Sequence, residues 1–171
     1  MSACWSEKFC QRAGLSSSTR VAIALGSNLG DRHDHLSFGQ ARLRDLLSNF
    51  QISQPIETAP VGVPDVQPAF LNAAAVGETS VTAHELLAAL LDIERAAGRT
   101  RPFAGAARTL DLDLILFGTT ILDEPGLTIP HPRFRERRFV LEPLAEIASD
   151  LRDPVTHLTI AELLARLPLA R

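Results

Sequence analysis

Residues 108–117 alternate polar and apolar side chains with the period of a half-buried β-strand, and this alternation strongly restricts the fold. One face carries two carboxylates, Asp111 and Asp113, which strand geometry places about 7 Å apart. Burying both without a partner is costly, and a divalent cation would neutralise them. Arg108, directly upstream, is typical of phosphate handling beside such a pair. A solvated strand face is the alternative for this segment taken alone. The apolar face consists of Leu110, Leu112, Leu114 and Leu116.

The composition indicates one folded domain with a metabolite as its partner. The chain has 171 residues, of which 46% are hydrophobic, enough for one domain with a full core. A net charge of −3 argues against a protein that coats nucleic acid. Both cysteines, Cys4 and Cys10, lie in the first ten residues, so we predict neither a disulfide framework nor a zinc site and expect a reducing, cytoplasmic setting.

The first 19 residues are set apart from the rest of the chain. They lack the apolar run of a signal peptide, and no segment of the chain reaches the roughly 18 to 20 apolar residues of a membrane span. We expect residues 1–19 to be a disordered N-terminal extension and residues 20–171 to form a single domain without membrane association. An organelle transit peptide is the alternative for the extension, and Glu7 argues against it.

Lysine usage excludes one large class of phosphate-binding proteins. The only lysine is Lys8, so residues 20–171 contain no Walker A motif. Arginine, backbone amides or a metal ion must therefore bind any phosphate, and seven of the sixteen arginines lie between Arg99 and Arg138. A genome that favours arginine explains the missing lysines but not this clustering.

The order of predicted elements indicates an α+β fold. Thr82 and Glu85 form a capping box that starts the second helix, and Gly98 ends that helix. The order β-α-β-β-α-β predicts a ferredoxin-like sandwich, in which two helices pack on one face of an antiparallel sheet, with C-terminal elaborations. We predict strands at 21–25, 50–58, 70–76 and 108–117, helices at 32–47, 83–97, 138–148 and 160–167, and a short extended pair at 120–122 and 127–129.

Four short motifs follow one another along the chain. They are Gly-Ser-Asn-Leu at 26–29, Phe-Leu-Asn-Ala at 70–73, the 108–113 segment, and Pro-His-Pro at 130–132 followed by Arg137 and Phe139. Together they resemble the 6-hydroxymethyl-7,8-dihydropterin pyrophosphokinase family of folate biosynthesis over about residues 20–150. The resemblance implies an elaborated ferredoxin-like fold, in agreement with the order of predicted elements.

The resemblance implies an ATP-dependent pyrophosphokinase that acts as a monomer on small molecules. MgATP would give its pyrophosphoryl group to the hydroxymethyl oxygen of 6-hydroxymethyl-7,8-dihydropterin and release AMP. Asp111 and Asp113 would hold two Mg²⁺ ions, which agrees with the charge argument above. Arg99 and Arg108 would join these aspartates as catalytic residues, because charge neutralisation and positioning provide most of the catalysis in such transfers.

The resemblance also implies two binding sites. In the pterin site two aromatic rings would stack on the substrate and Asn72 would bind its polar edge. Core packing is the alternative for each phenylalanine, a satisfied buried amide for Asn72, and a turn residue between prolines for His131. The residues matching the pterin site are Thr58, Val61, Phe70, Asn72 and Phe139. Those matching the ATP site are Glu94, Arg101, Leu114, Thr128, His131 and Arg137.

Some positions depart from the family pattern. The family often has Arg-Trp-Gly-Pro before the arginine matched by Arg108, where this chain has Gly-Ala-Ala at 105–107. Leu91 stands in place of a glutamine and Gly126 in place of an arginine. We expect an active enzyme with altered lid contacts, in which the loops at 59–68 and 99–107 are mobile without ligand and close over MgATP.

Two other functions fit parts of the pattern. A non-catalytic paralogue that binds pterin or nucleotide would not need two metal-holding carboxylates. A ferredoxin-like RNA-binding or sensor module is disfavoured by the acidic balance of charges and by the lack of an aromatic RNA-binding strand.

Overall fold

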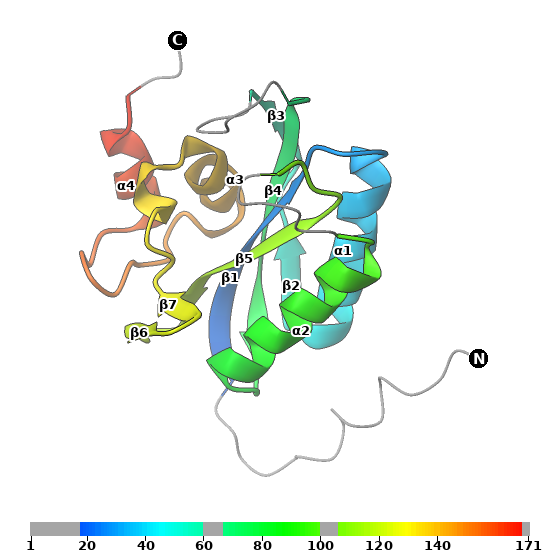
Figure 1. The fold of residues 1–171 in the computed structure, drawn as a ribbon. Helices are drawn as coiled ribbons and strands as arrows, with labels where there is room; N and C mark the ends of the chain where they lie inside the picture. The colour runs from blue at the N-terminus through cyan, green and yellow to red at the C-terminus, as the bar shows by residue number, and fades with distance from the viewer. Residues whose placement is uncertain (1–17, 60–66, 100–105, 169–171) are drawn as a thin grey trace.

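The computed structural model describes residues 18–59, 67–99 and 106–168, which combine helices with an antiparallel sheet in an α+β fold (Figure 1). Helices cover both faces of the sheet, so that the molecule has three layers (Figure 1). None of the helices in the described ranges is long and apolar enough to cross a membrane. The elements are β1 (Thr19–Ser27), α1 (Arg32–Leu46), β2 (Ser48–Ile52), β3 (Ile56–Thr58), β4 (Phe70–Thr79), α2 (Ala83–Ala96), β5 (Asp111–Phe117), β6 (Leu122–Glu124), β7 (Leu127–Ile129), the 3₁₀ turn η1 (Phe134–Glu136), α3 (Arg138–Ala148) and α4 (Ile160–Arg166).

The main sheet has the strand order β2-β4-β1-β5, and β3 also pairs with β4. The prediction of one strand at 50–58 is wrong, because the segment forms two strands that both pair with β4. The break falls at Ser53, whose hydroxyl accepts a hydrogen bond of 3.0 Å from the backbone N–H of Ala74. Pro55 follows and has no N–H to offer the sheet.

One face of the sheet packs against α1 and α2. Side chains from β1, such as Ile23 and Leu25, form a core with Leu43 of α1 and Leu90 of α2. The predicted capping box is confirmed, because the Thr82 side chain accepts from the N–H of Glu85 while the Glu85 carboxylate accepts from the N–H of Thr82. Both helices end within one residue of the predicted positions.

The opposite face of the sheet packs against the C-terminal helices α3 and α4. Phe134, Leu141 and Leu144 are fully buried there against Ala22 and Ala74, whose small side chains allow the helices to approach the sheet. The sequence predicts both helices but not the face that they cover. Because these helices use the second face, the described part of the chain buries apolar side chains on both sides of β1 and β4.

The alternation in β5 does not continue to the end of the strand. The pairing of β1 with β5 shifts register, so that Ala22 pairs with Leu116 and Ile23 pairs with Leu114, which leaves Ile115 between them. The prediction that Leu116 shares a face with Leu114 is therefore wrong, since Leu116 packs in the core beneath α3 and α4. The predicted face is confirmed for Leu110, Leu112 and Leu114, and Asp111 and Asp113 point to the other side.

A buried ion pair joins the segment before α3 to the connection between α3 and α4. Asp153 is 0% exposed and accepts two hydrogen bonds of 2.7 Å from Nε and Nη2 of Arg135. Its carboxylate also accepts from Thr156 Oγ1 and from the backbone N–H groups of Val155 and Thr156. Burial alone raises the pKa of Asp153, but the hydrogen bonds from Arg135, Thr156 and Val155 outweigh it and lower the pKa from 3.8 to about 2.

This lowered pKa predicts how stability depends on pH. A carboxyl with a depressed pKa in the folded state stabilises the fold above its unfolded pKa and loses that contribution as pH falls through the folded value. The ionised Asp153 should therefore contribute about 2 kcal/mol to the free energy of unfolding at pH 7. This contribution should decrease between about pH 4 and pH 2. Urea denaturation of wild type and Asp153→Asn from pH 7 to pH 3 should show a stability difference that shrinks with acid. A difference that stays constant over this range would contradict the prediction.

Candidate active site

A pocket lies on the α3 side of the sheet, over β1, β4 and β5. These three strands are neighbours in the sheet (Figure 1). It is bounded on the sheet side by strand residues and on the other side by the start of α3. Eight of the residues that the sequence singles out line this one pocket, although they come from segments far apart in the chain. They are Thr58, Phe70, Asn72, Arg108, Asp111, Asp113, Arg137 and Phe139.

The strand register explains why the floor of this pocket is open. Asp113 pairs with Ala24, and Asp111 and Asn72 both pair with Gly26 on opposite sides of β1. The residues between the polar side chains are therefore small. A Cβ at Gly26 would lie 3.3 Å from Asn72 Oδ1, which is tighter than an ordinary contact. The strand predicted at 21–25 stops before Gly26, whereas β1 includes it, and its lack of a side chain leaves room for the polar groups.

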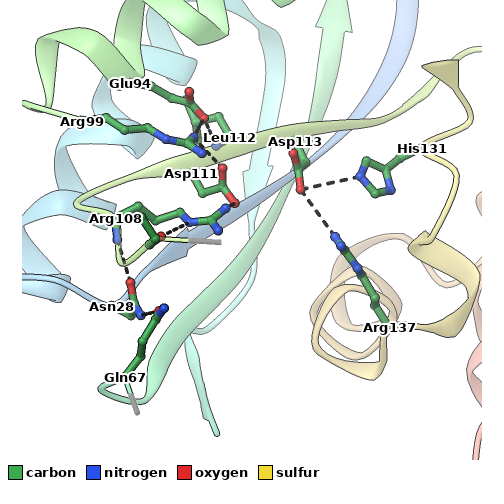
Figure 2. Close-up of polar contacts among 11 residues, drawn as sticks. Asn28, Gln67, Glu94, Arg99, Arg108, Asp111, Leu112, Asp113, His131 and Arg137 are labelled. Atoms are coloured by element: carbon green, nitrogen blue, oxygen red, sulfur yellow. Dashed lines mark hydrogen bonds and ion pairs between the residues drawn. The ribbon is translucent and has the colours of Figure 1, made fainter. Parts of the chain in front are cut away.

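Asp111 is held by two arginines (Figure 2). Nη1 of Arg99 lies 2.5 Å from Asp111 Oδ1, and Nη1 of Arg108 lies 2.6 Å from Oδ2. Arg99 also pairs with the buried Glu94, whose Oε1 accepts a hydrogen bond of 2.7 Å from the N–H of Leu112. Glu94 thus ties α2 to β5, and Arg99 extends this connection to the first carboxylate.

Asp113 faces a looser pair of cationic groups (Figure 2). Its Oδ2 lies 3.8 Å from Nε2 of His131 and 3.6 Å from Nη1 of Arg137. Burial and the neighbouring charge of Asp111 raise the pKa of Asp113, and the positive groups around it offset only part of this effect. Burial lowers the pKa of His131, although Asp113 acts in the opposite direction, and burial also lowers the pKa of Arg137.

The aromatic and amide groups lie beside these charges. The guanidinium of Arg108 lies 6.0 Å from the centroid of the Phe70 ring, and that of Arg137 lies 5.5 Å from the Phe139 ring. The amide Nδ2 of Asn72 donates a hydrogen bond of 2.7 Å to Oγ1 of Thr58. The pocket is therefore lined by two aromatic rings and an amide beside arginines of the kind that bind phosphate, and this combination suits a flat, polar heterocycle.

A second pocket lies on the other side of Asp113. It contains four residues that the sequence assigned to ATP: Glu94, Leu114, Thr128 and His131. Leu91 and Gly126, the two departures from the family pattern, also line it. Asp113 lines both pockets, so this carboxylate marks the boundary between them.

Asn28 organises the rim of the site, a role that sequence reasoning missed. It is 1% exposed, its Oδ1 accepts a hydrogen bond of 2.8 Å from the N–H of Arg108, and its own N–H donates to the carbonyl of Arg108. Its Nδ2 donates to Oε1 of Gln67 at 2.9 Å (Figure 2). The position of an asparagine in the 26–29 motif was the available signal, but its partners lie 39 and 80 residues away.

Three expectations fall wholly or mostly outside the described residues. Val61 and Arg101, assigned to the pterin and ATP sites, belong to the undescribed ranges 60–66 and 100–105. The expected closure of the loops at 59–68 and 99–107 concerns largely the same ranges. The segment 105–107, which stands in place of the family's Arg-Trp-Gly-Pro, begins in the second of them. The N-terminal extension expected at 1–19 is described only from residue 18.

The donor chemistry of the first pocket fits Mg²⁺. Asp111 and Asp113 are carboxylates on one face of β5, and each is partly exposed to the pocket, by 20% and 36% of its side chain. Mg²⁺ is bound in phosphoryl-transfer sites by one or two carboxylates together with waters and substrate phosphates. Arginines around such a pair suit the phosphates themselves, because a guanidinium binds two oxygens at once.

Comparison with known proteins agrees with this arrangement. Residues 22–149 match the family model described as 7,8-dihydro-6-hydroxymethylpterin-pyrophosphokinase. A 2-amino-4-hydroxy-6-hydroxymethyldihydropteridine pyrophosphokinase of Bacillus subtilis is 43% identical over 136 residues, which cover 78% of this chain and 81% of the relative. A protein of the same name from Pseudomonas aeruginosa is 41% identical over 154 residues, with 87% and 92% covered.

Solved structures show the same fold at low identity. The chain matches a Plasmodium falciparum HPPK-DHPS structure with a TM-score of 0.71 and 13% identity over 90% of its length, and it spans 44% of that longer chain. The family match covers most of the chain, and the two bacterial relatives are matched over most of their own length. The chain therefore belongs to the 7,8-dihydro-6-hydroxymethylpterin-pyrophosphokinase family.

Proposed function

We propose that this chain transfers pyrophosphate from MgATP to the hydroxymethyl group of 6-hydroxymethyl-7,8-dihydropterin and releases AMP, a step of folate biosynthesis. The observation that carries the proposal is the position of Asp113, which lines both the aromatic pocket and the pocket at Glu94 and Thr128. Two substrates bound in these pockets would meet at this carboxylate. A binder of pterin or nucleotide alone has no use for that arrangement.

The first pocket would hold the pterin. Phe70 and Phe139 both line it, and a flat heterocycle would stack on their rings. Asn72 lies at the sheet side with Thr58 as its partner. Stacking supplies affinity, while the amide supplies hydrogen bonds that select the edge of the ring. The hydroxymethyl group would then point toward Asp111 and Asp113.

The second pocket would hold the nucleotide. Leu114 and Thr128 line it together with Glu94 and His131, and His131 also approaches Asp113. The triphosphate would therefore leave this pocket beside Asp113 and reach the arginines of the first pocket. Arg101 would join them from its undescribed segment, and Val61 would contact the pterin.

The transfer itself asks little covalent chemistry of the protein. The hydroxymethyl oxygen attacks the β-phosphorus and gives up its proton to water. The new O–P bond forms as the bond between the β-phosphorus and the α-phosphate oxygen breaks, and AMP leaves. Asp111 and Asp113 would hold two Mg²⁺ ions, which would supply positive charge to neutralise the phosphates. Arg99, Arg108 and Arg137 would position the phosphates and stabilise the charge that builds on them.

The finer features of the fold and setting are part of the proposal. If β2 and β3 are counted as one strand, the order of elements around the main sheet supports a ferredoxin-like core with C-terminal elaborations. A monomer as the acting unit and a cytoplasmic setting are also part of the proposal.

An assay of AMP release tests the function directly. The full chain is incubated with MgATP and 6-hydroxymethyl-7,8-dihydropterin, and AMP and the pterin diphosphate are quantified by chromatography. We expect the two products in equal amounts, and none without the pterin. Binding of both ligands without AMP would favour the non-catalytic alternative, and hydrolysis of ATP without pterin diphosphate would contradict pyrophosphoryl transfer.

Asn72→Ala should weaken pterin binding selectively. The substitution would leave polar atoms of the bound ring unpaired, a loss of about 1–3 kcal/mol in binding free energy. Nucleotide binding should change little, because Asn72 lines only the first pocket. Calorimetric titration with a pterin analogue and with an ATP analogue measures both, with Gln51→Ala on the exposed side of β2 as a control. Unchanged pterin affinity would show that Asn72 is only a structural amide.

A further inference from the structure

The segment between β7 and α3 has very little regular structure, yet it positions two side chains beside Asp113. In residues 130–137 the one regular element is the 3₁₀ turn η1. His131 at its start and Arg137 at its end both face Asp113, at 3.8 Å and 3.6 Å (Figure 2). A short irregular segment can hold such positions only if other parts of the protein anchor it.

The beginning and the middle of this segment have evident anchors. The N–H of His131 donates a hydrogen bond of 3.0 Å to the carbonyl of Ile115 in β5, and Phe134 is fully buried against α3 and α4. Arg137 itself is the residue that precedes α3, and its side chain makes no capping hydrogen bond. Its side chain lines the pocket. Its backbone is held by η1 and α3, because its N–H donates to the carbonyl of Phe134 and its carbonyl accepts from two N–H groups in the first turn of α3. The position of Arg137 therefore depends on η1, and η1 itself needs an anchor.

The Arg135–Asp153 pair provides that anchor. The guanidinium of Arg135 binds the Asp153 carboxylate at two points, both 2.7 Å long, and lies 4.8 Å from the centroid of the Phe134 ring. A two-point bond fixes orientation as well as distance. Neither Arg135 nor Asp153 lines either pocket, so the pair contacts no substrate.

Asp153 is itself held rigidly. Besides Arg135, its carboxylate accepts from Thr156 and Val155, and its backbone is bonded on both sides to Leu158 and His157. These contacts lie in the connection between α3 and α4, beyond residues 22–149 that the family model matches. The connection therefore serves as a fixed support for a segment that reaches into the site.

We propose that Asp153 is a positioning residue of the pyrophosphoryl transfer, which acts through Arg135 to hold Arg137 at Asp113 and at the phosphates of ATP. This inference rests on the proposed function. It assigns a role in the reaction to a pair of residues outside both pockets, in addition to any stability that the pair contributes.

A double-mutant cycle with Arg137 separates positioning from stability. Asp153→Asn keeps the size of the side chain but weakens the two-point bond, and should lower kcat/KM for ATP by about tenfold to a hundredfold, the range that follows from a misplaced group. In an Arg137→Ala background the same substitution should change kcat/KM by less than about twofold, because the group that it positions is already gone. Folded protein is verified by circular dichroism at the assay temperature for every variant.

A second variant and a matched control complete the design. If Asp153→Asn fails to fold, Arg135→Lys takes its place in the design. Lysine keeps the positive charge but cannot bind the carboxylate at two points, so kcat/KM for ATP should fall here too. Asp150→Asn removes the exposed partner of Arg20 from the same connection and should leave kinetics unchanged. Equal effects of Asp153→Asn with and without Arg137, or a folded variant with unchanged kinetics, would overturn the proposal.

Affinity for a non-hydrolysable ATP analogue gives a readout that does not need turnover. Asp153→Asn should weaken binding of the analogue in the wild-type background and not in the Arg137→Ala background. If wild type releases no AMP, the proposed function fails while this binding cycle still tests the positioning role. If wild type is active and the cycle is additive, only the positioning role fails.

Discussion

Replacing either Asp111 or Asp113 with alanine should lower pyrophosphoryl transfer by about a thousandfold or more, while the protein remains folded. A cation bound at these carboxylates stabilises transition-state charge by several kcal/mol, and about 4 kcal/mol corresponds to a thousandfold in rate. Asp113 provides the cleaner test, because its closest cationic partners lie at 3.6 Å and 3.8 Å, whereas Asp111 is bound tightly by Arg99 and Arg108.

The measurement is the initial rate of AMP release as a function of Mg²⁺ concentration at saturating ATP and pterin. Asp113→Asn serves beside the alanine variant, since it keeps the shape and removes the charge. Asp45→Ala, on the exposed side of α1, is the matched control and should behave as wild type. Near-native turnover by folded Asp111→Ala or Asp113→Ala at saturating MgATP would show that the metal assignment is wrong.

Substituting Arg108 by alanine should reduce kcat by about a hundredfold, as expected for the loss of one donor aimed at developing charge. The fold should survive, because the N–H of Arg108 would still donate to Asn28 and Arg99 would still pair with Asp111. Arg108→Lys should restore only part of the rate, since an ammonium cannot bind two oxygens in the plane of a guanidinium.

Steady-state kinetics with separate titration of ATP and pterin measures this effect. A loss confined to kcat indicates an interaction made in the transition state, while a rise in KM alone indicates ground-state binding. Arg95→Ala, an exposed arginine near the end of α2, provides the control. If folded Arg108→Ala had the kcat of the wild type, Arg108 would not be a catalytic residue.

Local patterns in the chain were sufficient to predict most of the elements. The Thr82–Glu85 capping box, the start of α1 after Asp31 and the helix at 138–148 depend on residues a few positions apart, and the structure confirms them. The alternation at 110–114 likewise predicted which face of β5 is buried. Short-range hydrogen bonds and strand periodicity determine these features, so they can be read without knowing the rest of the fold.

Local patterns misled where a neighbouring strand overrode them. The period of two predicts Leu116 on the face of Leu114, but the pairing with β1 inserts Ile115 as an extra residue and turns Leu116 to the other core. The interruption between β2 and β3 depends in the same way on the contact between Ser53 and Ala74 in another strand. Such register shifts are properties of a pair of strands and not of either strand alone.

Which chemical groups the protein carries can be read from the chain: two aspartates on one strand face, a set of arginines in place of lysine, and aromatic and amide groups in an order that resembles a pterin pyrophosphokinase. How these groups combine follows from the folded structure. It assigned Arg99 and Arg108 to Asp111, it gave Arg137 and His131 to Asp113, and it turned Arg135 away toward Asp153. Ion pairs between distant segments depend on the register of the sheet and on the packing of α3 and α4, and neither leaves a periodic signal in the chain.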